Sequence, residues 1–72
     1  MSPRDPVTIV LNGDATEVEP GLSITELLEL LRVPQGRVVV EHNRRILRGE
    51  ELAAARIAAG DELELVHFVG GG

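Results

Sequence analysis

The last residues of the sequence offer its most specific chemistry. Three glycines, Gly70, Gly71 and Gly72, follow the segment Val66-His67-Phe68-Val69. Glycines lose the most backbone entropy on folding and add no packing, so stability does not explain them. Extended, they form an arm of roughly 10 Å. Without side chains, that arm can enter a narrow channel and present the α-carboxylate of Gly72 to another protein's active site. Because a carboxylate is a poor electrophile, it would need activation, most simply as an acyl-adenylate made from ATP.

The side chains offer little chemistry of their own. The sequence has no cysteine, and its serines are Ser2, near the start, and Ser23, which we expect to cap a helix. His42 and His67 have no second histidine at metal-ligand spacing. We expect His42 to lie in a solvent-exposed turn and His67 to pack at the end of the sheet. The sequence therefore predicts no active site, no metal site and no bound cofactor, so the chain is not expected to be an enzyme.

The composition indicates one small globular domain. The 72 residues are 43% hydrophobic and 26% charged, and the formal net charge is −5. A negative charge argues against nucleic-acid binding because the phosphate backbone selects for the opposite sign. No apolar run is long enough to span a membrane, and residues 1–6 lack the apolar stretch of a signal peptide. We therefore expect a cytoplasmic protein that binds neither nucleic acid nor membranes and is monomeric when free.

The first half of the sequence predicts a hairpin followed by a helix. Residues 7–11 alternate as a half-buried strand, Asn12-Gly13 favours a type I′ turn, and residues 14–19 form a weaker return strand. Ser23-Ile24-Thr25-Glu26 is a capping box. Apolar residues then recur at helical spacing and form one stripe, namely Ile24, Leu27, Leu28 and Leu31. Pro34 and Gly36 are expected to end the helix.

The second half predicts three more strands. Residues 37–41 are rich in β-branched side chains, residues 42–44 form a turn, and a short strand passes through Ile46 and Leu47. A brief helical turn over 50–55 precedes a last strand over 62–69. One long helix can cover only one sheet face, so we expect an α+β fold of the β-grasp type. About five strands form a mixed sheet wrapped on the helix, with the first and last strands parallel at its centre. Residues 1–6 are an extended lead-in, 7–69 the domain and 70–72 a flexible tail.

Alternation in the last strand predicts an exposed apolar surface beside the glycines. Leu63 and Leu65 face the helix, whereas Glu64, Val66 and Phe68 face outward. Phe68 is the one aromatic residue in the sequence, and exposed aromatic and aliphatic neighbours favour a contact surface. The alternative is that a loop covers this face. The basic residues Arg44, Arg45 and Arg48 form either a solvated turn or a second docking surface.

From Val7 to Gly72 the sequence resembles the ThiS family of ubiquitin-like sulfur carriers in thiamine biosynthesis. The resemblance rests on the Asn-Gly turn and on the segments Ser23–Leu28, Val38–Asn43 and Gly60–Gly72. The ending Val-His-Phe-Val-Gly-Gly-Gly is its most specific part, since the earlier pieces are general to β-grasp domains. The proline-rich lead-in and the third glycine, Gly70, are small departures from the family pattern.

The resemblance implies a defined reaction sequence. In such carriers a ThiF-type enzyme uses ATP and magnesium to adenylate the terminal glycine, which here is Gly72. Sulfur derived from cysteine, through a persulfide or a related donor, then displaces AMP and leaves a thiocarboxylate, which delivers sulfur to the thiazole ring in thiazole synthase. Gly70 and Gly71 would complete the tail, and Val66 and Phe68 would form the docking surface next to it.

Three other functions stay open from the sequence. The small subunit of molybdopterin synthase shares the chemistry and the Gly-Gly ending, although such chains are usually somewhat longer. A ubiquitin-like modifier would form amides on target lysines rather than donate sulfur. An interaction module would not use its glycine tail at all. Removing Gly72 would abolish the function of a carrier or a modifier but would leave an interaction module intact.

Overall fold

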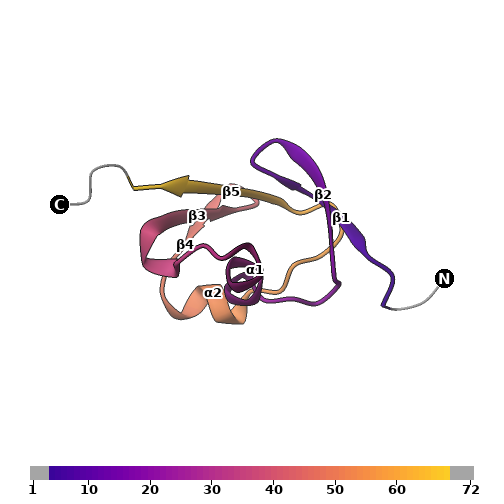
Figure 1. Cartoon of the computed structure of the whole chain (residues 1–72), viewed down its shortest axis with the longest axis horizontal. Helices are drawn as coiled ribbons and strands as arrows, with labels where there is room; N and C mark the ends of the chain where they lie inside the picture. Colours follow the sequence, from indigo (N-terminus) through magenta and orange to yellow (C-terminus); the bar gives the residue numbers. More distant parts are fainter. Residues whose placement is uncertain (1–3, 69–72) are drawn as a thin grey trace.

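The computed structural model describes residues 4–68. Their elements, in chain order, are β1 (Val7–Leu11), β2 (Asp14–Val18), α1 (Ile24–Leu31), the 3-10 turn η1 (Gln35–Arg37), β3 (Val38–His42), β4 (Arg45–Leu47), α2 (Glu50–Ala54) and β5 (Glu62–His67). The strands form one sheet, and both helices lie on the same side of it (Figure 1). This is the α+β, β-grasp arrangement that the sequence predicts.

The sheet has the order β2-β1-β5-β3-β4, which places β5 at its centre. β5 runs parallel to β1 and antiparallel to β3, with Leu11 beside Leu63 and Val40 beside Leu65. The predicted parallel pairing of the first and last strands is therefore confirmed. Because β5 is central, the strand that leads to the glycines is held on both sides.

Two short sequence motifs fix the ends of the elements as predicted. Asn12 and Gly13 both have positive φ, 49° and 86°, as a type I′ turn requires. At the start of α1, the Ser23 hydroxyl accepts from the Glu26 N–H at 3.0 Å, and the Glu26 carboxylate accepts from the Ser23 N–H at 2.9 Å. Hydrogen bonding of Ser23 to the Glu26 carboxylate, first from its backbone N–H and then from its side chain, lowers the pKa of that carboxyl.

The core fills the space between the inner face of the sheet and the helices. Its most deeply buried side chains come from both layers: Ile9, Val40 and Leu63 from strands, and Ile24 and Leu28 from α1. Leu52 of α2 and Ile57 close the same cluster. Within residues 4–68, no helix is long and apolar enough to cross a membrane.

The helix ends just before Pro34, as the sequence predicts. Arg32 caps α1 in the left-handed conformation, with φ 59°, and its N–H donates to the Glu29 carbonyl at 3.1 Å. The helix thus stops before Pro34 and Gly36. Leu31, which we placed on the buried stripe, is 41% exposed and lies in the last turn of the helix, so that part of the prediction is wrong.

Candidate functional site

β5 places its side chains alternately on the two faces of the sheet. Leu63 and Leu65 lie in the core, at 1% and 8% exposed, whereas Val66 and Phe68 are 58% and 57% exposed. The predicted outward orientation of Val66 and Phe68 is confirmed. Across the described residues, no loop covers them, so the alternative of a covered outer face is wrong. Their role in partner binding stays a prediction.

Backbone and side-chain hydrogen bonds hold β5 in place up to the start of the glycine segment. The Phe68 N–H donates to the Arg37 carbonyl at 3.0 Å, which extends the pairing with β3 one step past His67. On the other side, the Asn12 side-chain oxygen accepts from the Leu65 N–H at 2.7 Å, and the Asn12 N–H donates to the Leu63 carbonyl at 2.8 Å. The turn residue Asn12 therefore also anchors β5. The described part of the strand is therefore held in place as far as Phe68.

Apolar residues from neighbouring strands extend the exposed surface around Val66 and Phe68. Val39 lies directly beside Val66 in the β3–β5 register, and Ile46 on β4 is 45% exposed. We call Val39, Ile46, Val66 and Phe68 the outer apolar patch. Exposed apolar residues that are contiguous, rather than scattered, mark an interaction site more often than a bare surface.

Acidic residues border the outer apolar patch farther along the sheet. Glu41 lies opposite Glu64 in the β3–β5 register. Glu62 forms an ion pair with the exposed Arg44, whose Nε lies 4.0 Å from Glu62 Oε1. The outer face thus has an apolar end near Phe68 and an acidic end near the hairpin turn between β3 and β4. Of the predicted basic cluster, Arg45 pairs with Glu51 at 3.0 Å, so Arg44 and Arg45 both have acidic partners.

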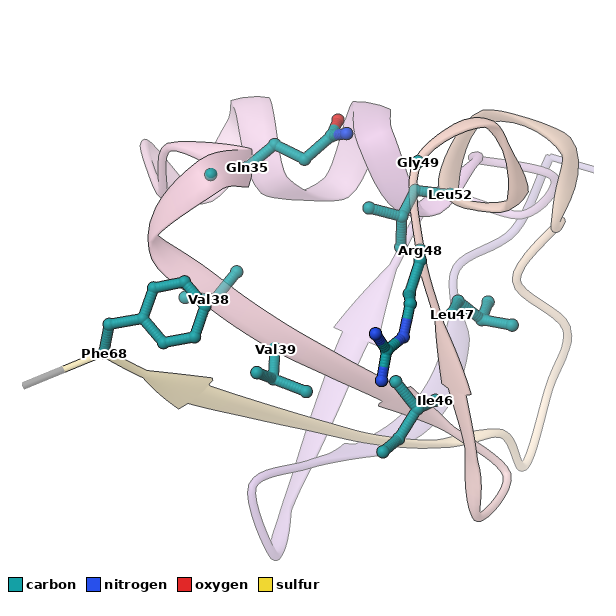
Figure 2. A pocket seen from close by; sticks show the side chains of 10 residues that line it. Gln35, Val38, Val39, Ile46, Leu47, Arg48, Gly49, Leu52 and Phe68 are labelled. Atoms are coloured by element: carbon teal, nitrogen blue, oxygen red, sulfur yellow. The ribbon is translucent and has the colours of Figure 1, made fainter.

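A cavity of about 480 Å³ opens at the edge of the outer apolar patch. Figure 2 shows it between the start of β3 and the segment that joins β4 to α2, with the Phe68 ring beside Val38 on one side and Ile46 and Arg48 on the other. Val38, Leu47 and Leu52 connect it to the core. The sequence does not indicate this cavity, because its walls come from three stretches that are distant along the chain: residues 35–39, residues 46–52 and Phe68.

His42 does not lie in a solvent-exposed turn as the sequence predicted. The turn is the two-residue type formed by Asn43 and Arg44, both with positive φ, so His42 is still part of β3. Its side chain is 16% exposed, and Nε2 lies 2.8 Å from Asp61 Oδ2. Partial burial alone would raise the pKa of the Asp61 carboxyl, but hydrogen bonds with His42, the Ala58 N–H and Asn43 hold it below its ordinary value.

His67 is also placed differently from the prediction, because it is exposed rather than packed. It pairs with Val38 at the last step of the β3–β5 ladder. Val38, its partner in the ladder, is buried in the core, so the core reaches this step of the sheet on the β3 side while the side chain of His67 stays exposed.

The arrangement suits docking better than catalysis. Ser23, the serine within residues 4–68, is 5% exposed and caps α1, so it does not serve the pair of His42 and Asp61 as a nucleophile. Among residues 4–68, no three histidine or acidic side chains gather as metal ligands do. The predicted site of modification, Gly72, and the rest of the tail, Gly70 and Gly71, lie outside the described residues.

Comparison with known families covers the tail as well as the domain. A model of the ThiS family matches residues 9–72, which include both the outer apolar patch and all three final glycines. The chain belongs to the ThiS family. That family consists of small sulfur carrier proteins of thiamine biosynthesis.

Solved structures support the ThiS assignment over nearly the whole chain. The crystal structure of the thiamine biosynthesis protein ThiS from Geobacter metallireducens is 36% identical, with a TM-score of 0.79. The match covers 92% of this chain and 100% of that one. A solution NMR structure of a thiamine biosynthesis protein from the same organism gives a TM-score of 0.75 at 36% identity and covers 92% and 88% of the two chains.

Two curated relatives of this ThiS-family chain are thiazole synthases. Those of Paramagnetospirillum magneticum and Magnetococcus marinus are each 34% identical over 64 residues, which is 89% of this chain. The chain spans only a fifth of the length of these relatives, 20% in both cases. The match therefore concerns one region of those longer proteins.

Proposed function

We propose that this chain carries sulfur as a thiocarboxylate on Gly72 and donates it for thiazole formation in thiamine biosynthesis. The observation that carries the proposal is the ThiS family match, because it continues through the three final glycines. The chain would act as the co-substrate of partner enzymes and not as an enzyme itself. We expect this to take place in the cytoplasm.

The chemistry begins when a ThiF-type enzyme, which uses ATP and magnesium, activates the Gly72 carboxylate. A carboxylate oxygen attacks the α-phosphorus of ATP, which forms an acyl-adenylate and releases pyrophosphate. A sulfur nucleophile then attacks the acyl carbon, and AMP leaves. Where the donor is a cysteine-derived persulfide, a thiol must next cleave the S–S bond, which leaves the thiocarboxylate on the carrier and a disulfide on the donor side.

The described residues support a role in presenting the tail. Hydrogen bonds fix β5 on its β1 side as far as Leu65 and on its β3 side as far as Phe68, so the described part of the strand leads toward the tail from a defined position. Val66 and Phe68 give a partner an apolar surface next to that point. Sulfur transfer needs the reacting carbon held within reach of the attacking atom, and docking beside the tail supplies that constraint.

Thiazole synthase is the acceptor that we propose. Two curated relatives with this name contain a region similar to the chain, which supports a shared pathway and favours the thiazole ring over molybdopterin. The assay combines the chain, a ThiF-type enzyme, ATP, magnesium and sulfide, and measures AMP release. AMP release should require both ATP and the chain.

Truncation separates this proposal from that of an interaction module. Deletion of Gly72 should abolish AMP release, while Gly70→Ala, which keeps the length and the terminal carboxylate, should retain measurable release. The intact mass of the untreated protein is recorded first to establish which residue carries the carboxylate. AMP release that is equal for the deletion variant and the unaltered chain would contradict the proposal.

A further inference from the structure

The cavity beside Phe68 exists because β4 is shorter than β3, the strand with which it pairs. β4 pairs with β3 only from Val40 to His42, with Leu47 opposite Val40. After Leu47 the chain turns away through Gly49, whose φ is 53°, and enters α2. The first part of β3 therefore has β5 on one side and, on the other, the cavity.

The backbone of Val38 faces this gap. In an antiparallel ladder, alternate residues direct their N–H and C=O groups to opposite sides. The Arg37 carbonyl accepts from the Phe68 N–H, and the Asn43 N–H donates to the Glu62 carbonyl. Odd-numbered positions along β3 therefore bond toward β5. Even-numbered positions, which include Val38, direct their N–H and C=O groups toward β4. Among the backbone hydrogen bonds of the described residues, none joins Val38 to the segment Arg48–Gly49. The cavity thus offers one strand-like donor and acceptor pair.

The walls of the cavity are apolar apart from its two ends. Val38, Val39, Leu47 and Leu52 line it, and Phe68 and Ile46 stand at its rim, as Figure 2 shows. Gln35 lies at one end, and the Arg48 side chain extends along the opposite wall. A volume of about 480 Å³ lies within the range of sites that enclose small ligands or peptide side chains.

The charge at the cavity is opposite to that of the whole chain. Its lining contains Arg48 and no acidic residue, although the formal net charge of the protein is −5. Arg44, Arg45 and Arg56 each pair with a carboxylate, whereas Arg48 is in none of the ion pairs found among the described residues. Its backbone N–H donates to Glu51, so Glu51 accepts from Arg45 and from that N–H. The Arg48 guanidinium therefore has no carboxylate partner among residues 4–68 and can pair with one that comes from outside.

We propose that the cavity binds an extended segment of the adenylating enzyme that carries an apolar residue next to an aspartate or glutamate. The apolar side chain enters between Phe68 and Leu52, the carboxylate pairs with Arg48, and the segment's backbone bonds to Val38 as an added strand. This rests on the proposed function, because it names the partner of the surface beside the tail. The adenylating enzyme would then recognise Arg48 and the cavity as well as Val66 and Phe68.

The test uses matched pairs of variants of the full chain. Arg48→Glu reverses the charge in the cavity, and Arg44→Glu makes the same change on a side chain that is 88% exposed outside it. Gly36→Leu fills the cavity from its wall, and Gly36→Ala is its control. Gly36 lines the cavity, and a Cβ added there meets no atom within 4 Å, so Gly36→Ala should keep the fold; circular dichroism and a thermal melt check the fold of Gly36→Leu. Calorimetric titration of the ThiF-type enzyme without ATP gives Kd, and mass spectrometry after turnover gives the sulfur gain.

The proposal predicts that Arg48→Glu and Gly36→Leu each raise Kd roughly tenfold or more, while both controls stay within about threefold of the unaltered chain. At saturating carrier, each variant should still reach the full mass gain. Equal Kd values for Arg48→Glu and Arg44→Glu, or for the two Gly36 variants, would overturn the proposal. So would an unaltered chain that dimerises through the cavity, seen as dimers in sedimentation that Arg48→Glu abolishes.

The same data separate this inference from the proposed function. If the unaltered chain binds the enzyme but gains no sulfur, the carrier chemistry is contradicted while the docking inference can still be judged from Kd. If it gains sulfur while all variants bind alike, the docking inference alone is contradicted. If it neither binds nor gains sulfur, both are.

Discussion

The two faces of β5 differ although they belong to the same six residues. On the inner face, Leu63 and Leu65 are 1% and 8% exposed and pack against the helices; on the outer face, Val66 is 58% exposed. Each face nevertheless carries an apolar residue near the end of the strand, Leu65 inside and Val66 outside, so an apolar side chain alone does not decide which face is buried. The difference shows that an apolar residue contributes to stability only where another layer covers it. We expect the inner face to determine folding and the outer face to determine docking.

The largest effect is expected from the inner face. Leu63→Ala should lower the free energy of unfolding by about 2–5 kcal/mol, because it leaves a cavity between the sheet and the helices. Guanidinium denaturation followed by far-ultraviolet circular dichroism measures this change. A loss below about 1 kcal/mol would mean that the inner face is less well packed than its burial indicates.

A smaller effect is expected from the polar cluster where β3 and β5 meet. Asp61→Asn should lower the free energy of unfolding by about 1–3 kcal/mol near neutral pH, since the hydrogen bonds with His42 and the Ala58 N–H are made by a charged carboxylate. Urea denaturation at pH 7 measures this. Asp14→Asn, on the exposed edge strand β2, is the control and should change little.

The pH dependence of the same cluster has a defined sign. The pKa of Asp61 is lowered in the folded state, so folding favours the ionised form. The stabilisation is fully present above the ordinary pKa of an unfolded aspartate, about 3.9, and is lost as the pH falls through the lower folded value. Denaturation over this acidic range should show a steeper loss for the unaltered chain than for Asp61→Asn. Identical slopes would contradict the assigned hydrogen bonds.

The next effect concerns the helix that covers the inner face. Ser23→Ala removes the side-chain acceptor at the start of α1 and should cost about 1 kcal/mol. Thermal and urea denaturation measure it, and Ser23→Thr, which keeps the hydroxyl, should retain most of the stability. Equal losses for the two variants would indicate that burial of Ser23, rather than capping, explains the effect.

The smallest effect on stability is expected from the outer face. Val66→Ala should change the free energy of unfolding by no more than about 0.5 kcal/mol, as is usual for exposed side chains. In contrast, we expect its Kd for the adenylating enzyme to rise. A loss of stability comparable to that of Leu63→Ala would remove the distinction between the two faces.

Local patterns predicted most of the fold. The Asn12-Gly13 turn, the capping box at Ser23 and the alternation of β5 each depend on neighbours within a few residues, and the structure confirms all three. Binary patterning of this kind selects a fold class before any long-range contact is considered. The orientation of Val66 and Phe68 followed from the same alternation.

The errors arise where a residue's surroundings depend on distant segments. A turn one residue shorter than expected keeps His42 in β3, where Asp61, far along the chain, reaches it. Leu31 has the spacing of the buried stripe of α1 but is 41% exposed, since burial depends on what the sheet and α2 place beside each turn. The cavity beside Phe68 needs η1, β3, β4 and α2 together, so no local pattern in the sequence indicates it.

The carrier role itself is tested most directly by the mass of the protein after turnover. The chain is incubated with a ThiF-type enzyme, ATP, magnesium and sulfide, and the product is analysed intact and after fragmentation. We predict a mass gain equal to the replacement of one oxygen by sulfur, located on Gly72 and absent without ATP. An unchanged mass with an enzyme that adenylates another carrier, or a gain located elsewhere in the chain, would contradict the account.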